Sequence, residues 1–154
     1  MNLYLVQHAE PKPEEEDPER SLSATGREEI RKTAAFAAGV GVRAEVIRHS
    51  GKTRARQTAE ALSASLSPVK GIAEADGLKP LDDPSVWAER LALTKDDTML
   101  VGHLPHLSRL AGLLVMRDPE SSPISFRMGG MLCLARDDTG GWTVRWMVTP
   151  ELLS

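Results

Sequence analysis

The chain has 154 residues, 41% of them hydrophobic and 27% charged, with a net charge of −3 at pH 7. This length and composition are typical of a soluble globular protein, and we expect residues 1–154 to form one domain. The acidic balance gives no bulk attraction to nucleic acid, and no apolar run reaches the roughly 18 residues of a membrane span or forms the core of a secretory signal. Because Cys133 is the single cysteine, no disulfide can form within the chain, and a reducing cytoplasm is the expected compartment.

The predicted elements alternate between strands and helices along most of the chain. A short run of strand-forming residues predicts a buried strand at residues 2–7, and a proline-rich acidic loop follows it. Ser23 is then expected to cap a helix that Gly39 and Gly41 end. The pattern continues with strands predicted at residues 44–48, 69–73 and 97–102, and with helices at residues 51–66, 85–93 and 104–116, the last with Pro105 in its first position.

The last part of the chain differs, because two strand-like segments there have no helix between them. Residues 131–135 and 143–148 flank the sequence "RDDTGG", which is typical of a hairpin turn. Strands that are each followed by a helix indicate a parallel sheet covered by helices. We therefore expect an α/β fold with a mostly parallel central sheet and a C-terminal antiparallel hairpin.

Polar side chains follow three of the predicted parallel strands. His8 and His103 each come directly after a strand, and another strand leads to Ser50. Ligands of open α/β sheets bind outside the carboxyl ends of the strands, so these residues are expected at one rim. Ser50 is a candidate N-cap of the following helix, whose free amides and positive dipole end attract anions. Arg54, one turn into that helix, points back towards its N-terminus and adds charged donors.

Two histidines, an arginine and a helix N-terminus suit a tetrahedral dianion, and phosphate is the obvious candidate. A neutral imidazole can attack phosphorus and become phosphorylated, which divides phosphoryl transfer into two easier steps. The second imidazole and the guanidinium would stabilise the charge on the equatorial oxygens. This chemistry requires no metal ion and no cofactor, so none is expected.

Three segments, "LVQHA", "HSGKTRARQTAE" and "VGHLPH", resemble the motifs of the histidine phosphatase superfamily, which has the phosphoglycerate-mutase-like fold. The short length and the segment "RSLSATG" are similar to the compact SixA-type branch, the phosphohistidine phosphatases. The resemblance implies a three-layer α/β/α sandwich and a phosphatase acting on phosphohistidine of a protein or on a small phosphomonoester. The expected partner is thus a phosphorylated protein or a small phosphate ester, with no nucleic acid and no membrane, and the sequence leaves the oligomeric state open.

The resemblance also assigns roles to single residues. It makes His8 the nucleophile, His103 the second histidine of the phosphate pocket and Arg54 the pocket arginine. Ser50 lies at the helix entrance in this assignment. Arg20 matches an arginine that the compact branch usually has before its first helix, which places it near the pocket mouth.

The first motif departs from the family pattern. The usual Arg-His-Gly is Gln7-His8-Ala9 here. Ala9 fits if its φ angle is negative, whereas Gln7, the expected phosphate-binding residue, offers an amide without the charge or the fork of a guanidinium. Losing one or two hydrogen bonds to a charged group costs about 10- to 10⁴-fold in transition-state stabilisation. Two interpretations therefore stay open: a phosphatase with reduced activity, and a domain of this fold that binds phosphate or phosphoproteins without catalysis.

A proton donor for the leaving group is the least defined part of the predicted site. Family members that act on alcohol phosphates use a carboxylic acid, and the candidates in the matching region are Glu74, Asp76, Asp82 and Asp83. No motif chooses among them. A protonated imidazole leaves as a neutral ring and needs less help than an alkoxide, so the absence of an acid would favour phosphohistidine as substrate.

Several other features have simpler interpretations. His103 and His106 lack companion carboxylates, which argues against a metal pair. The basic segment "KTRAR" has no companion aromatic residues, and no G-x-G-x-x-G sequence indicates a dinucleotide site. We expect the acidic residues 14–19 to form a solvated loop, His49 to neighbour the site, and Cys133 to be a core residue.

Overall fold

The structure, a computed structural model, describes all of residues 1–154. Its strands are β1 (Asn2–Gln7), β2 (Val46–His49), β3 (Ile72–Glu74), β4 (Thr98–Gly102), β5 (Met131–Arg136) and β6 (Trp142–Val148). Its α-helices are α1 (Ala24–Gly39), α2 (Thr53–Leu66), α3 (Pro84–Leu93) and α4 (His106–Met116), and a 3-10 helix, η1 (Pro150–Leu152), follows β6.

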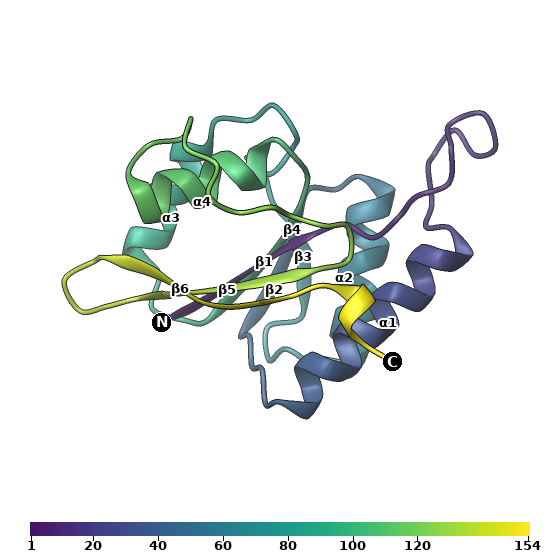
Figure 1. Ribbon diagram of the computed structural model, residues 1–154, viewed down its shortest axis with the longest axis horizontal. Helices are drawn as coiled ribbons and strands as arrows, with labels where there is room; N and C mark the ends of the chain where they lie inside the picture. The colour runs from purple at the N-terminus through teal and green to yellow at the C-terminus, as the bar shows by residue number, and fades with distance from the viewer.

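The strands form one mixed sheet in the order β3-β2-β4-β1-β5-β6 (Figure 1). The pairs β3–β2, β2–β4 and β4–β1 are parallel, whereas β5 runs antiparallel to β1 and β6 antiparallel to β5. The predicted parallel core with a C-terminal hairpin is therefore confirmed. Because β1 and β4 are neighbours and parallel, the residues that follow them leave the sheet at the same edge.

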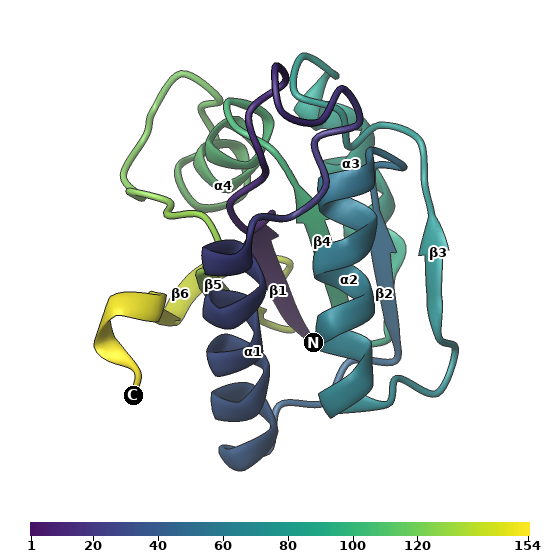
Figure 2. The ribbon, with the colours of Figure 1, turned by 90° about the vertical axis from the view of Figure 1, so that its right-hand side faces the viewer.

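Helices cover both faces of the sheet, which makes the three layers that the family resemblance implied (Figure 2). Strand β1 shows how both faces are buried: Tyr4 and Val6 pack with α1 and α2, while Leu3 and Leu5 pack with α3 and α4. Successive side chains of a strand point to opposite faces, so a strand between two helical layers must be apolar at every position. This explains the uninterrupted apolar run before His8.

Two helices begin later than the sequence predicted. Ser50 was expected to cap α2, but the cap position belongs to Lys52, and the helix starts at Thr53. Gly51 has a φ of +90°, so the chain turns there through a backbone conformation that cannot be part of a helix. Pro105 similarly occupies the cap position of α4 and is not its first helical residue. Ser23, in contrast, caps α1 as predicted, with its hydroxyl accepting from the Gly26 amide.

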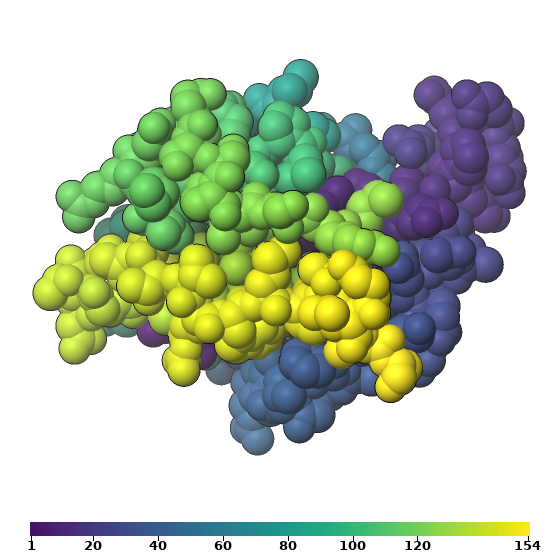
Figure 3. All heavy atoms as spheres, viewed as in Figure 1, coloured from purple at the N-terminus to yellow at the C-terminus, as the bar shows by residue number.

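The acidic loop between β1 and α1 stands out from the body of the molecule, at the upper right of Figure 3 in purple. Its base is closed by the bridge between Pro11 and Leu22 and by the Lys12 amide, which donates to the Ser21 carbonyl at 2.7 Å. The glutamates of its tip are exposed. The predicted solvated loop is confirmed, and none of the helices is long and apolar enough to cross a membrane.

Candidate active site

The two histidines predicted at strand ends lie side by side. The ring centroids of His8 and His103 are 5.0 Å apart, and the rings are tilted by 49°. The backbone amide of His8 donates to the Gly102 carbonyl at 3.0 Å, which continues the β1–β4 ladder beyond the strand and fixes the distance between the two residues. Both histidines are mostly enclosed, with exposed fractions of 8% and 2%.

Ser50 joins this pair from the end of β2. Its Oγ atom is hydrogen-bonded to Nε2 of His103 at 2.6 Å, and it accepts from the Lys52 amide at 3.3 Å. The turn that makes this possible is held by His49, whose Nδ1 accepts from the Gly51 amide at 3.1 Å. Ser50 thus lies at the entrance of α2, as the resemblance implied, although it does not cap the helix.

The ring of His8 is oriented by the residue that follows it. Its Nδ1 atom lies 2.8 Å from the carbonyl oxygen of Ala9. A carbonyl oxygen only accepts hydrogen bonds, so Nδ1 carries the proton and Nε2 keeps a free lone pair. Ala9 has a negative φ, since it is absent from the residues with positive φ, and the alanine therefore fits this backbone as expected.

Both imidazoles are held in the neutral form. Burial lowers the pKa of His8 from 6.5 to about 4, with a further lowering by the charges of Arg54 and Arg20. Burial lowers the pKa of His103 to about 3, assisted by His8, Arg54 and Lys52. At neutral pH, His8 thus presents an uncharged nucleophilic nitrogen in positive surroundings, which favours both the attacking base and a bound anion.

Arg54 brings the positive charge to the histidines from the first turn of α2. Its Nε atom is buried without a hydrogen-bond partner, as is Nδ1 of His103. Burial and the nearby charge of Arg20 lower the pKa of Arg54. A buried guanidinium without an acceptor is costly, and an anion bound between Arg54 and the imidazoles would supply the missing acceptor.

Arg20 reaches the site from the base of the acidic loop. Its backbone is left-handed, with a φ of 52°, and its Nε donates to the Lys12 carbonyl at 3.2 Å. Its charge lowers the pKa values of both His8 and Arg54.

The side chain of Gln7 makes no hydrogen bond to the other predicted site residues. Its Oε1 atom is buried without a partner. The side chain lines a cleft of about 440 Å³ together with Glu10, Thr25, Leu104 and Arg127 among others. The amide of Gln7 therefore adds no charge to the cluster of His8 and its neighbours.

The four carboxylates considered as proton donors line a single cleft beside Ser50. This cleft has a volume of about 480 Å³, and Lys79 is its one basic lining residue. It is lined by Ser50, Glu74, Ala75, Asp76, Gly77, Lys79, Asp82, Asp83 and Val86. The structure thus gathers the acid candidates around one member of the predicted phosphate site.

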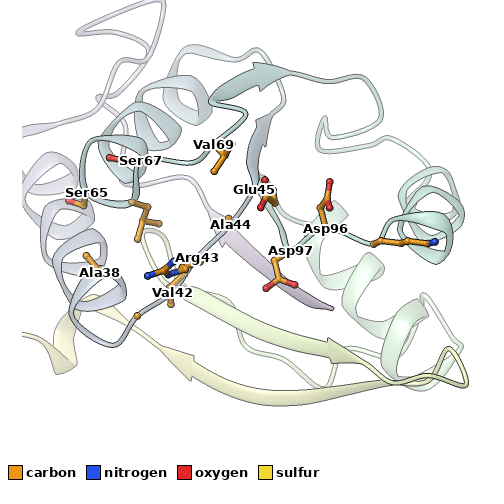
Figure 4. A pocket seen from close by; sticks show the side chains of 13 residues that line it. Ala38, Val42, Arg43, Ala44, Glu45, Ser65, Ser67, Val69, Asp96 and Asp97 are labelled. Carbon is orange, nitrogen blue, oxygen red and sulfur yellow. The ribbon is translucent and has the colours of Figure 1, made fainter.

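The largest cavity of the protein lies elsewhere and contains none of the predicted site residues. It has a volume of about 690 Å³ and is bounded by the ends of α1 and α2 and by the segments that enter β2 and β4 (Figure 4). Its lining includes Arg43, Glu45, Ser67 and Asp97. Because the histidines follow the carboxyl ends of the strands, this cavity is at the opposite end of the sheet.

One contact at the site was missed in the sequence. Thr58 of α2 is fully buried, and its hydroxyl accepts from the Ala9 amide at 3.0 Å. The available signal was its spacing of four residues from Arg54, which puts both on one face of the helix. Residue type alone could not indicate that this face meets the segment after His8.

Comparison with known proteins agrees with this geometry. A model of the histidine phosphatase superfamily (branch 1) matches residues 3–82, a range that includes His8, Ser50 and Arg54. The chain belongs to the histidine phosphatase superfamily. The resemblance inferred from the three motifs is therefore confirmed, and a comparison with curated proteins gives no significant match.

Solved structures of this superfamily share the whole architecture. A protein histidine phosphatase SixA in complex with tungstate superposes with a TM-score of 0.87 at 24% identity, over 99% of each chain. A protein from Agrobacterium tumefaciens described as a SixA phosphohistidine phosphatase gives a TM-score of 0.78 at 24% identity, over 97% of each chain. Phosphoserine phosphatase from Entamoeba histolytica gives 0.69 at 13% identity, over 96% of each chain. At these identities the likeness establishes the phosphoglycerate-mutase-like fold.

Proposed function

We propose that this protein is a phosphatase that works through a phosphohistidine intermediate at His8 and requires no metal ion. The observation that carries the proposal is the arrangement of His8, whose Nε2 lone pair is free and whose ring lies 5.0 Å from that of His103. A structural neighbour of the SixA type binds tungstate, a tetrahedral oxyanion with the shape of phosphate. Arg54 and His103 have the unpartnered buried nitrogens that such an anion would use.

The reaction follows in two displacements. Nε2 of His8 forms a bond to phosphorus while the bond from phosphorus to the leaving atom breaks, and that atom takes the electron pair and a proton from a carboxylic acid of the cleft beside Ser50. Water then attacks the same phosphorus and gives a proton to the carboxylate formed in the first step, the N–P bond breaks, and Nε2 regains its lone pair. Charge on the equatorial oxygens is stabilised in both steps by Arg54 and His103. Because burial keeps the pKa of His8 at about 4, the nucleophile needs no prior deprotonation at neutral pH.

We further propose phosphohistidine of a protein as the preferred substrate, with a small phosphomonoester as the other class. The cleft beside Ser50 is lined by four carboxylates and one lysine. A leaving group that becomes an imidazole or imidazolium suits an acidic cleft, whereas an anionic leaving group would be repelled. The composition of the cleft thus supports a nitrogen leaving group.

Among the four carboxylates, Glu74 is the best placed to donate a proton. The other three are tied to neighbours: Asp76 pairs with Arg90, Asp82 accepts from the Lys79 amide, and Asp83 caps α3 by accepting from the Ser85 amide. The pKa values of Asp76 and Asp83 are lowered by those hydrogen bonds, which makes both poor acids. Glu74 makes no such hydrogen bond or ion pair, and its carboxylate lies against the Gly51 backbone at the turn beside the site.

A second candidate function rests on Gln7. His8, His103 and Arg54 are present at the site. Gln7, however, supplies no charge where the family usually has arginine, and its Oε1 has no hydrogen-bond partner. A protein of this kind could bind a phosphoryl group tightly enough to recognise phosphoproteins and yet turn it over slowly or not at all.

The deciding experiment measures phosphate release from a phosphohistidine peptide and from an aryl phosphate. The variants are His8→Ala, Gln7→Arg and Glu74→Gln, with Asp82→Asn as a control from the same cleft. We expect His8→Ala to fall to the uncatalysed rate and Glu74→Gln to slow the aryl phosphate by about 10²-fold or more, with Asp82→Asn near wild type. A phosphoenzyme is sought after an alkaline, acid-free quench.

The outcomes separate the two functions. Equal rates for the wild type and His8→Ala would exclude catalysis by His8. Bound phosphate without any phosphoenzyme, together with a large gain in Gln7→Arg, would establish the binding function and show that position 7 alone limits activity. Faster turnover of the aryl phosphate than of the phosphohistidine peptide would contradict the proposed substrate.

A further inference from the structure

Thr58 connects the nucleophile to the phosphate-binding helix through both of its hydrogen-bonding capacities. Its hydroxyl oxygen accepts from the amide of Ala9 at 3.0 Å, and its hydroxyl proton is donated to the carbonyl of Arg54 at 2.7 Å. The residue is 0% exposed, and so is Ala9. Water therefore cannot replace either contact, and the hydroxyl alone satisfies the Ala9 amide.

The Ala9 residue held in this way is the one that orients His8. Its carbonyl accepts the Nδ1 proton of the His8 ring at 2.8 Å, and this contact leaves Nε2 unprotonated. The position of the Ala9 carbonyl depends on the conformation of the residue, whose amide is fixed by Thr58. The sequence of contacts runs from α2 through the Thr58 hydroxyl and Ala9 to the nucleophilic ring.

The same hydroxyl also fixes the position of His8 relative to Arg54. Thr58 and Arg54 are four residues apart on α2, so they share one face of the helix. The segment after β1 is hydrogen-bonded to that face through the short side chain of Thr58, and Ala9 also packs in the same apolar cluster as Ala55 and Ala59. His8 and the guanidinium thereby keep a fixed separation across two elements that the chain connects only through α1 and β2.

We propose that Thr58 is a positioning residue that holds His8 in its reactive tautomer and in register with Arg54. The inference rests on the proposed function for its effect on catalysis, but its effect on the His8 ring is independent of any activity. Misplacement of a reacting group by about 1 Å typically costs about 100-fold in rate. A purely structural role in packing α2 against the sheet would leave both the tautomer and the rate unchanged once the protein is folded.

The test compares variants that keep or remove the hydroxyl. Thr58→Val keeps the shape and removes the hydroxyl, and Thr58→Ser keeps the hydroxyl. Thr98→Val is the matched control, because Thr98 is also buried and bonds a backbone carbonyl, that of Asp96, but lies at the far end of β4. Thr58→Ala replaces Thr58→Val if the latter does not fold.

Two readouts are taken on each folded full-length variant. The first is the single-turnover rate of His8 phosphorylation, for which we expect Thr58→Val to lose about 10- to 100-fold in the maximal rate with little change in KM. Thr58→Ser should stay within about threefold of the wild type, and Thr98→Val should be unchanged. The second is the ¹⁵N NMR spectrum of the His8 ring, where Thr58→Val should shift population from the Nδ1–H to the Nε2–H tautomer.

The results distinguish this inference from the proposed function. A Thr58→Val protein with the wild-type tautomer and the wild-type phosphorylation rate would overturn it, and so would equal rate losses in Thr58→Val and Thr98→Val. If the wild type forms no phosphohistidine, the proposed catalytic function is excluded. The tautomer shift in Thr58→Val still decides whether Thr58 positions His8.

Discussion

Mild acid should destabilise this protein through two buried histidines of the candidate site, and His8 gives the clearest measure. Burial lowers the pKa of His8 from 6.5 to about 4. As the pH falls, the imidazole is therefore protonated at a higher pH in the unfolded chain than in the native state. A group that is more basic in the unfolded state favours unfolding when protons are added. The free energy of unfolding is therefore unaffected above about pH 6.5 and decreases as the pH falls from there towards 4.

The size of the effect follows from the two pKa values. At pH 5 the unfolded imidazole is almost fully protonated and the folded one almost fully neutral, which corresponds to a loss of about 2 kcal/mol for His8 between pH 7 and pH 5. His103, with a pKa of about 3, contributes a similar loss. The expected destabilisation from the pair is a large part of the stability of a typical domain.

Urea unfolding at pH 7 and pH 5, in buffers free of phosphate and other oxyanions, measures this loss. The His8→Asn variant removes one titrating group, so its free energy of unfolding should decrease by about 2 kcal/mol less than that of the wild type over this range. Thr98→Val, which changes no titrating group, should show the wild-type pH dependence. If His8→Asn loses as much stability as the wild type between the two pH values, His8 is not held neutral by burial and the account of the nucleophile is wrong.

Two further predictions concern the turn beside the site and the core. Gly51→Ala should lower the free energy of unfolding by about 1–3 kcal/mol, because Gly51 has a φ of +90°, which strains a residue with a side chain. A Cβ at Gly51 would meet only the flexible end of Glu74, which can move away, so Gly41→Ala, with a φ of +81° and open space, should cost a similar amount in the same urea experiment. A negligible loss of stability in both variants would contradict the argument. Cys133 is buried and its thiol pKa is raised to about 11 by burial, so it should react with a thiol reagent at pH 8 only when the chain is unfolded, and rapid labelling of the native protein would show that β5 is accessible.

Much of the candidate site could be predicted because its residues stand at strand ends. The apolar run before His8 and the one before His103 each predict a buried strand, and parallel strands bring their carboxyl ends to one edge. The motif around Arg54 added the helix that supplies the charge. These features depend on local patterns, so the sequence was sufficient to indicate them.

Two of the errors and omissions involve contacts between distant segments, whereas the late start of α2 also reflects the local backbone of Gly51. Ser50 was expected to cap α2, yet its hydroxyl is hydrogen-bonded to His103, 53 residues further along the chain. Nothing in the sequence of residues 50–54 indicates that competing partner. Thr58 was overlooked for the same reason, since its contact with Ala9 spans 49 residues.

The sequence by itself determined the alternation of strands and helices, the hairpin at the end, and the candidate residues for a phosphate site. Periodicity and residue chemistry are properties of short segments, so they can be recognised without knowledge of the fold. Only the tertiary structure decided which nitrogen of His8 is free, which candidate acid remains without a partner, and that Oε1 of Gln7 is buried without a hydrogen bond. Those outcomes depend on burial and hydrogen-bond partners that exist only after the sheet and its two helical layers have assembled.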